Sequence, residues 1–301
     1  MRIGHISDLH LYDMTGARVR DFLNKRMTGG LNLLLGRRGL HQASLSERAL
    51  QILKTECDHL VVAGDLTNLS LPSEFVAADA LLRRYFDEDD MTIVPGNHDF
   101  YTKESALARR FEKSIYSKNQ SDLAGFVEDS PWPFVKIRND VAFIGLNSAQ
   151  PRPFFVAAGM LGREQRNALI KLLKKPELQQ KFIVIALHHH LFRAINAPGE
   201  ALRNLRDRAA FLRILKKYSP HLVLHGHSHV CHMKVWGNTL ISEAGSLSED
   251  GGKRSSRRGK FKIYEVNDNK IQKIETWRYN DTDFVLFKKE RVNGKKIEAF
   301  V

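Results

Sequence analysis

The sequence is poor in cysteine and contains no long hydrophobic stretch. Cys57 and Cys231 are its two cysteines among 301 residues, too few for a disulfide framework, and this usage fits a reducing compartment. No apolar run approaches the roughly 18 residues that suggest a membrane-spanning helix. The opening residues MRIGHIS alternate like a strand and lack the layout of a signal peptide. We therefore expect a cytoplasmic protein.

The balance of charge is strongly positive. Lys and Arg number 47 against 34 Asp and Glu, which gives a net charge of +13. This charge favours polyanionic partners, namely nucleic acid, phosphorylated substrates or an anionic membrane, without choosing among them. Hydrophobic residues make up 43% of the chain, enough for one large core, and neither an internal repeat nor a long linker divides it. We expect a single domain over residues 1–301.

Short apolar segments alternate with helical patterns along most of the chain. The expected strands are residues 2–7, 59–63, 91–95, 141–146, 182–187 and 222–224. The expected helices are residues 44–56, 72–86, 103–115, 163–174 and 202–217. Ser44 and Glu47 have the spacing of a capping box, and Pro72 suits the first turn of a helix. Alternation of strands and helices predicts an α/β sheet covered by helices.

From about residue 233 the pattern changes to short strands joined by turns. These strands are predicted at residues 233–235, 239–242, 260–266, 270–279 and 284–288. They indicate an antiparallel portion that closes a second sheet. The predicted fold class is therefore α/β, with a two-sheet β-sandwich core flanked by helices.

Two basic segments interrupt this organisation. Residues 17–40 carry six Lys and Arg among apolar side chains, which is typical of an amphipathic segment lying on anionic lipid; the alternative is a helical hairpin packed over the active site. Residues 251–262 carry six more in a Gly/Ser setting and predict a basic loop, whose role stays open.

Five short elements that can bind metal ions follow predicted strands. They are Asp8-Leu9-His10, Gly64-Asp65, Gly96-Asn97-His98-Asp99, His188-His189-His190 and Gly226-His227-Ser228-His229. Loops at the carboxyl ends of strands are where α/β sheets gather their ligands. Carboxylate and imidazole donors suit manganese, iron(II) or zinc, and an Asp oxygen can bridge two such ions.

This series resembles the calcineurin-like metallophosphoesterase superfamily, whose signature is D-x-H, G-D, G-N-H-[DE], a single H, and G-H-x-H. The resemblance spans residues 8–229 and implies two divalent metal ions, manganese and/or iron with zinc as an option. The implied ligands are Asp8, His10, Asp65, Asn97, His188 or His189, His227 and His229. Within this set, the resemblance makes Asp65 the bridge between the two ions.

The fourth element departs from the family pattern, which is usually H-x-P or H-H-P. Here Leu191 stands where the proline is expected. Counting from the strand favours His188 as the ligand, whereas aligning Leu191 with the proline favours His189. Both assignments stay open on the sequence.

The resemblance also implies a reaction, the hydrolysis of phosphate esters. A hydroxide bridging the two ions attacks phosphorus, His98 protonates the leaving group, and Asp99 orients His98. Breadth of resemblance favours a phosphodiesterase similar to bacterial class III cyclic-nucleotide phosphodiesterases.

Other substrates stay open on the sequence. Residues 17–40 also look like lipid-directed members such as UDP-diacylglucosamine pyrophosphatases, so the alternative is a pyrophosphatase acting on a nucleotide-linked lipid at the inner face of the membrane. A DNA nuclease would also suit the positive charge. A non-catalytic scaffold is a further alternative, against which the intact ligand set argues.

Overall fold

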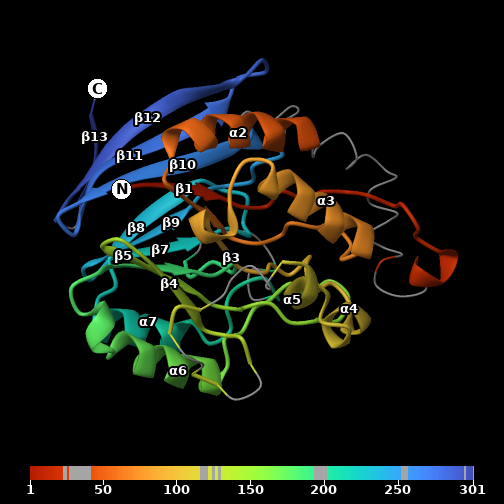
Figure 1. The fold of residues 1–301 in the computed structure, drawn as a ribbon, viewed down its shortest axis with the longest axis horizontal. Helices are drawn as coiled ribbons and strands as arrows, with labels where there is room; N and C mark the ends of the chain where they lie inside the picture. Colours follow the sequence, from red (N-terminus) through yellow and green to blue (C-terminus); the bar gives the residue numbers. More distant parts are fainter. Residues whose placement is uncertain are drawn as a thin grey trace.

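The computed structural model of the protein describes residues 1–22, 26, 42–115, 121–123, 126–127, 130–192, 199, 202–251, 257–294 and 296–300. Two β-sheets face each other, and helices lie outside them (Figure 1). The α/β sandwich predicted from the sequence is thus confirmed.

The first sheet has seven strands, of which β1, β2 and β3 are parallel. In spatial order the strands are β13 (Lys296–Phe300), β12 (Phe284–Asn293), β11 (Lys270–Tyr279), β10 (Lys260–Asn267), β1 (Arg2–Ile6), β2 (His59–Val62) and β3 (Met91–Ile93). Strand β10 runs antiparallel to β1 and places Lys262 opposite His5. The carboxyl ends of β1–β3 therefore meet at one edge.

The second sheet has six strands, with a parallel centre and antiparallel edges. In spatial order they are β4 (Phe134–Arg138), β5 (Val141–Gly145), β6 (Phe182–Ala186), β7 (Leu222–His225), β9 (Thr239–Glu243) and β8 (His232–Trp236). Buried side chains of both sheets, such as Ile3, Val61, Phe143 and Val184, belong to one continuous core. This core fixes the two sheets relative to each other.

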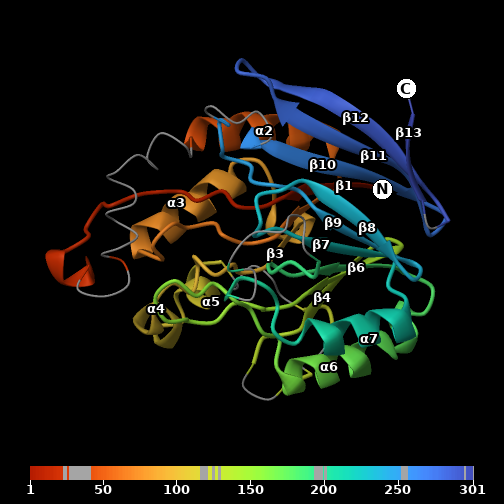
Figure 2. The ribbon, with the colours of Figure 1, turned by 180° about the vertical axis from the view of Figure 1, so that it is seen from behind.

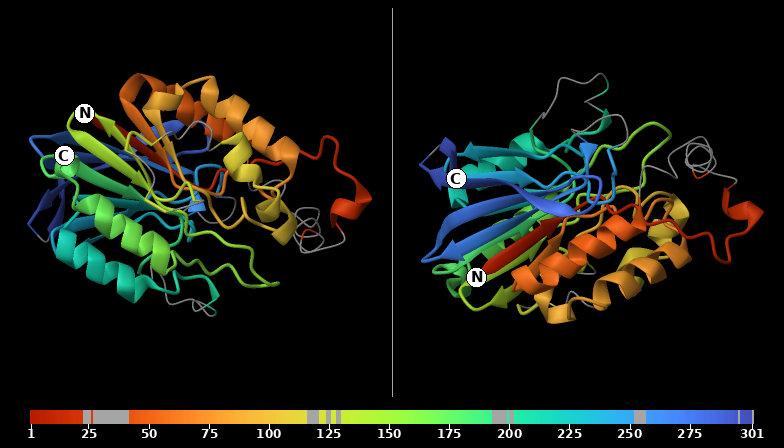
Figure 3. Two further views of the ribbon diagram at one scale, coloured as in Figure 1. Left: turned by 60° about the horizontal axis from the view of Figure 1, so that its bottom comes forward. Right: turned by 90° about the horizontal axis from the view of Figure 1, so that it is seen from above.

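Helices cover the outer side of each sheet (Figures 2 and 3). On the first sheet lie α2 (Ala43–Glu56) and α3 (Pro72–Arg83), and on the second lie α6 (Arg163–Leu173) and α7 (Arg208–Tyr218). Helix α2 approaches β1 closely, because a Cβ atom at Gly4 would lie 2.9 Å from the Leu53 side chain. The shorter helical elements are η1 (Val19–Phe22), η3 (Glu88–Asp90), α4 (Lys103–Leu107), α5 (Arg110–Ser114) and η5 (Pro176–Leu178).

Several predicted elements need correction. The helix expected over 103–115 is broken into α4 and α5, because Arg109 takes a left-handed conformation with φ of 51°. The helix expected over 202–217 begins at Arg208. The capping box at Ser44 was wrong: α2 begins one residue earlier, and its N-cap Gln42 makes no side-chain capping bond.

The C-terminal tail was predicted to close a second sheet, and this holds for part of it. Strands β8 and β9 join the second sheet, whereas β10–β13 extend the first sheet beyond β1. The difference arises because β10 pairs with the N-terminal strand, a contact between residues more than 250 positions apart. Strands β4 and β13 were not expected from the sequence.

The basic segments are only partly described. Most of residues 17–40, including the proposed lipid-facing surface, lies outside the described residues. Arg26 is 1% exposed and donates hydrogen bonds to the carbonyls of Leu69 and Ser70, so this side chain is not available to lipid. Likewise Lys260 and Lys262 are not in a loop, since both lie buried in β10. Among the described residues, no helix has the length and apolar character needed to cross a bilayer.

Candidate metal centre

The five sequence elements meet where the strands of the two sheets end. Asp8, Asp65 and Asn97 follow β1, β2 and β3 of the first sheet, whereas the 188–190 and 227–229 segments follow β6 and β7 of the second. Backbone hydrogen bonds tie these loops together: the Asp8 N–H donates to the Gly64 carbonyl at 3.0 Å. Residues far apart in sequence are thus brought into one site.

One group of potential ligands consists of Asp8, His10 and His229. The Nε2 atom of His229 lies 3.3 Å from Asp8 Oδ1 and 3.2 Å from His10 Nε2. Asp8 is fully buried, and His10 is 5% exposed. Two imidazole nitrogens and a carboxylate oxygen therefore converge on one point.

A second group consists of Asp65, His188 and His227. The Nε2 atom of His188 lies 3.3 Å from Asp65 Oδ2 and 3.2 Å from His227 Nδ1. The same Asp65 Oδ2 lies 3.8 Å from His10 Nε2 of the first group. Asp65 consequently stands between the two groups, as a bridging carboxylate must.

The backbone of these residues is held in an uncommon conformation. Asp8, His10, Asp65, His227 and His229 all have positive φ, between 48° and 82°. Such a conformation costs about 1–3 kcal/mol for each non-glycine residue and persists where the surrounding structure enforces it, often at functional sites. This backbone strain destabilises the fold, but it directs the five side chains into the site.

Close packing of the loops depends on glycine. A Cβ atom at Gly96 would lie 2.1 Å from Asp65 Oδ1, and one at Gly226 would lie 2.5 Å from Asp8 Oδ2. Both clashes involve carboxylates of the centre. These glycines therefore let the backbone approach the ligand groups closely.

His188 and His189 differ in what their ring nitrogens contact. The Nδ1 atom of His188 donates to the Ala63 carbonyl at 2.7 Å, which leaves Nε2 facing Asp65 and His227. In His189, Nδ1 lies 2.8 Å from the Ser148 hydroxyl and Nε2 lies 3.1 Å from the Ala157 carbonyl. Both nitrogens of His189 thus have protein partners outside the ligand groups.

His98 lies at the rim of the first group, with its ring centroid 4.7 Å from that of His10. Its Nδ1 donates to the Asn68 carbonyl at 2.7 Å, and the Tyr101 ring stacks on it at 5.2 Å between centroids. Its backbone N–H donates to Asp65 Oδ1 at 2.7 Å. Its ring is therefore fixed both in plane and in position.

Asp99 was expected to orient His98, but its carboxylate makes different contacts. It accepts hydrogen bonds from the N–H and hydroxyl of Thr67, both at 2.9 Å, and from the Gly96 N–H at 2.8 Å. It therefore joins the loops after β2 and β3, while the Asn68 carbonyl contacts the His98 ring. Burial, together with the neighbouring Asp65 charge, raises the pKa of Asp99 to about 7.

The pKa shifts at the centre show that its buried carboxylates favour positive charge beside them. Burial by itself lowers the pKa of His188, but the Asp65 carboxylate raises it to about 9. Burial likewise opposes protonation of His229, and Asp8 and Glu249 raise its pKa to about 10. Conversely, His229 lowers the pKa of Asp8 despite burial. Divalent cations can replace the protons that these carboxylates attract.

The contact between Glu249 and His229 was not predicted from the sequence. Its Oε1 atom lies 2.8 Å from His229 Nδ1, the ring nitrogen that points away from Asp8. The residue is 5% exposed and follows β9 in a segment without a recognisable motif. Carboxylates in this position commonly fix the tautomer of a metal-binding histidine. Only the tertiary structure could reveal the pair.

The donor set fits a pair of divalent metal ions. Buried polar atoms that lack a hydrogen-bond partner point to missing ligands: Asp8 Oδ1, Asn97 Oδ1 and His227 Nε2. Unsatisfied buried groups of this kind are costly unless an ion or a water occupies the site. Oxygen and imidazole donors are suited to manganese, iron or zinc.

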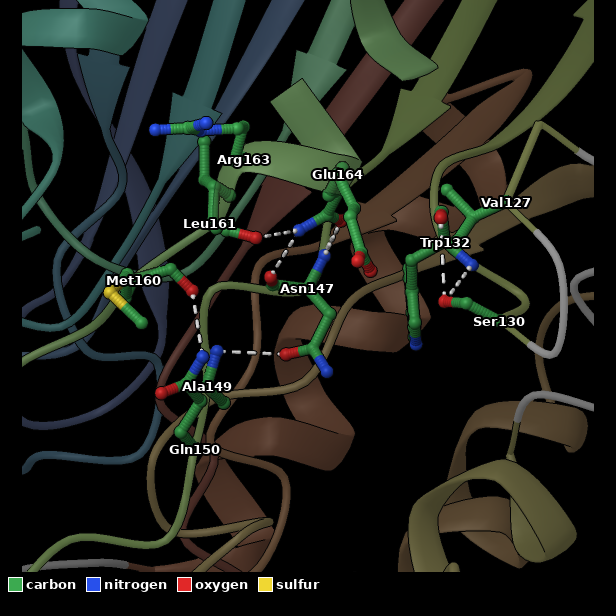
Figure 4. A pocket seen from close by; sticks show the side chains of 12 residues that line it. Val127, Ser130, Trp132, Asn147, Ala149, Gln150, Met160, Leu161, Arg163 and Glu164 are labelled. Atoms are coloured by element: carbon green, nitrogen blue, oxygen red, sulfur yellow. Dashed lines mark hydrogen bonds between the residues drawn. The ribbon is translucent and has the colours of Figure 1, made fainter. Parts of the chain in front are cut away.

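A cavity of about 420 Å³ lies beside the loop that follows β5 (Figure 4). Asn147 and Ala149 line it, and Ser148 between them bonds His189. Trp132 and the first residues of α6 also line it, and Gln165 of α6 hydrogen-bonds the Asn147 backbone. The side chain of Asn147 is held by the Ala149 N–H, as the dashed line in Figure 4 shows. The loop that lines the cavity thus also contacts His189.

Fold and site together define a metal-dependent phosphoester hydrolase. The model of the calcineurin-like phosphoesterase family matches residues 1–231, and the chain belongs to this family. No curated protein sequence matches the chain.

Solved structures with similar folds have low sequence identity. Purple acid phosphatase PPD1 from yellow lupin seeds is 12% identical, with a TM-score of 0.57, over 96% of this chain and 52% of that one. TT1561 of Thermus thermophilus is 12% identical, with a TM-score of 0.53, over 92% and 98%. GAP50, the anchor in the inner membrane complex of Plasmodium, is 13% identical, with a TM-score of 0.50, over 98% and 89%. These likenesses concern the fold alone.

Proposed function

We propose that the protein is a dinuclear-metal phosphodiesterase with His98 as its general acid. The observation that carries this proposal is the position of Asp65, whose Oδ2 lies 3.8 Å from His10 Nε2 and 3.3 Å from His188 Nε2. One carboxylate thus lies close to two ligand groups, each of which draws residues from both sheets. Such sharing suits two ions that act on one phosphate.

The proposed ligands fall into two sets that share Asp65. Asp8, His10 and His229 would hold one ion. Asn97, His188 and His227 would hold the other. When bound, the pair would polarise the phosphoryl oxygens and activate water near neutral pH, with manganese, iron or zinc as candidate ions.

We assign His188 rather than His189 as the ligand, because the protein itself occupies both ring nitrogens of His189. Replacing His188 with Ala should lower the bound metal content from two ions towards one. His189→Ala serves as the matched control and should retain both, as measured by elemental analysis of the purified proteins. Loss of metal in the control alone would reverse the assignment.

The geometry of His98 suits proton donation from Nε2. Because the Asn68 carbonyl holds Nδ1–H at 2.7 Å, a second proton on this ring sits on Nε2. Transfer of that proton to the departing alkoxide leaves a neutral ring with its bond to Asn68 intact. A general acid of this kind typically contributes about 10²–10⁴-fold to the rate.

The proposed substrate is a phosphodiester. The breadth of the motif resemblance supports a phosphodiester as the substrate. A nucleotide-linked lipid is the alternative substrate, suggested by the sequence of residues 17–40, most of which lie outside the described residues. Hydrolysis assays with a phosphodiester and with a nucleotide-linked lipid distinguish these two substrate classes.

The test is hydrolysis of bis(p-nitrophenyl) phosphate by chelator-treated protein, before and after manganese is added. We expect turnover that requires metal and is lost in Asp65→Ala, because both ligand groups lose their shared carboxylate. A metal-dependent rate that persists in Asp65→Ala would contradict the shared site.

A second substrate with a poor alkyl leaving group tests His98 in the same assay. His98→Ala should keep both ions but lose about 10²–10⁴-fold of its rate on this substrate. The loss should be much smaller on the nitrophenyl ester, whose leaving group needs little protonation. Equal losses on both substrates would argue against a general acid.

A further inference from the structure

A second cavity, of about 650 Å³, lies between strand β8 and strands β10–β12. Figures 1 and 2 show β8 running beside this part of the first sheet, and β8 also contacts β13. Val230, which follows the proposed ligand His229, lies in its wall. One wall of the cavity therefore adjoins a proposed ligand in sequence, yet none of its lining residues belongs to the proposed ligand set.

The lining carries more positive than negative charge. Its cationic side chains are Lys260, Lys262, Arg278 and Lys288. The acidic side chain in the lining is Glu290, which pairs with Lys288 at 2.6 Å. The guanidinium of Arg278 lies over the Phe287 ring, 3.8 Å from its centroid. The cavity is thus a basic chamber with an aromatic wall.

Lys262 is a buried cationic side chain in this lining. It is 1% exposed, and its ammonium donates to the Ser242 hydroxyl at 3.3 Å. Within the part of the chain that the structure describes, no carboxylate forms an ion pair with it. Burial and Lys262 itself lower the pKa of the nearby His5 imidazole well below its ordinary value, so this ring is neutral and is no counter-charge for the ammonium.

A buried ammonium without a counter-charge is unfavourable, because no ion pair offsets its desolvation. A protein tolerates such a group when an anion binds beside it. Because β10 pairs with β1, Lys262 lies opposite His5, and Arg278 lies beside Lys260 through β11. Neighbouring strands consequently place several cationic side chains in the wall of one chamber.

We propose that this chamber binds a phosphate group, free or as the head of a larger molecule. Lys262, Arg278 and Lys288 would contact its oxygens, since ammonium and guanidinium groups are the usual phosphate partners in proteins. Met233, Phe287 and Ile297 supply the apolar part of the lining. This site is distinct from the hydrolytic centre and does not depend on metal ions.

The experiment measures binding of inorganic phosphate by calorimetry to the full-length protein, both metal-loaded and after chelation. We expect binding that survives chelation and weakens about tenfold or more in Lys262→Met, the loss expected for a hydrogen bond to a charged group. Lys288→Gln, at a side chain that is 47% exposed, tests the same site with little risk to folding. It should weaken binding by a few-fold.

Lys289→Met is the matched control, because Lys289 neighbours Lys288 on β12 but does not line the cavity. It should bind phosphate like the unmodified protein. Absence of binding after chelation, or equal losses in all three variants, would overturn the site. If the protein showed no metal-dependent turnover, phosphate binding at this chamber would still be expected. The hydrolytic proposal and the phosphate-site proposal can therefore be refuted independently.

A second arm identifies the source of the phosphate. Dioctanoyl phosphatidic acid, below the concentration at which it aggregates, is titrated under the same conditions. Binding that is at least about tenfold tighter than that of inorganic phosphate, with the gain lost in Phe287→Ala, supports a lipid or other apolar phosphate ester. Equal affinities support free phosphate as the ligand.

Discussion

His229 illustrates how single contacts determine the chemistry available to a side chain. One of its ring nitrogens faces Asp8 at 3.3 Å, and the other lies 2.8 Å from Glu249. If Glu249 accepts the proton of Nδ1, the Nε2 lone pair is directed into the site, where a metal ligand needs it. Glu249 would therefore act as a positioning residue, through His229.

Replacing Glu249 with Gln should weaken metal binding while leaving the fold intact. Loss of such a carboxylate typically costs about 10–100-fold in metal affinity or activity. Metal affinity is measured by competition with a chromogenic chelator, and the melting temperature of the metal-free protein should hardly change. Glu265→Gln, at an exposed ion pair with Lys273, is the control and should keep full affinity. Equal affinities in the two variants would exclude a positioning role for Glu249.

The sequence could predict that these side chains gather in one place, because each motif lies directly after an apolar strand, and strand ends converge in a sheet. It could not decide between His188 and His189, since the difference lies in the partners Ala63, Ser148 and Ala157. It also placed Asp99 against His98, where the structure has the Asn68 carbonyl. Such partners come from loops whose path no local pattern specifies.

At the scale of elements, the loop between β2 and α3 links the helix to the site. Glu74 in the first turn of α3 accepts the N–H groups of Leu69 and Leu71, at 2.9 and 3.0 Å. The same loop supplies the Asn68 carbonyl that holds His98. One loop is therefore bonded both to α3, through Glu74, and to the proposed general acid His98.

Glu74 should make stability dependent on pH. It is fully buried, and burial raises its pKa from 4.5 to about 8. Between these values the folded state keeps a proton that the unfolded state releases, so the free energy of unfolding falls as the pH rises from about 5 to about 8. One titrating group can lower this free energy by at most about 1.4 kcal/mol for each pH unit within that window.

The measurement compares urea unfolding of the unmodified protein and Glu74→Gln across this pH range. Glutamine keeps the size and the acceptor oxygen but cannot ionise. The difference in unfolding free energy between the two proteins should therefore shift in favour of the variant as the pH rises. Parallel pH profiles would show that Glu74 does not titrate in this window.

Element boundaries also show where prediction from sequence fails. The strands that carry the site were located within two residues, because each is a short apolar run followed by polar residues. The helix at 103–115 was expected to be continuous, since no local sequence pattern predicts the left-handed conformation of Arg109. Strand β10 was recognised, yet its partner β1 lies more than 250 residues away, and such pairing is decided by the whole core.

At the scale of the molecule, the proposed metal ions join the two halves of the sandwich. Asp8 and His10 follow a strand of the first sheet, whereas His229 follows a strand of the second. Buried polar groups and strained backbone converge at this junction, with positive φ at all three residues. Ions bound here would therefore cross-link the two sheets.

Chelation should therefore lower the melting temperature of the whole domain. An ion that binds the folded state alone stabilises it by about 4 kcal/mol at a thousandfold excess over its Kd. For two ions in a chain of this size, the expected decrease on chelation is on the order of 10 °C. Asp65→Asn should melt at nearly the same temperature with and without chelator, because it lacks the shared ligand. An unmodified protein that melts identically in both conditions would show that the ions do not bridge the two sheets, since a cross-link between them cannot be removed without cost to the fold.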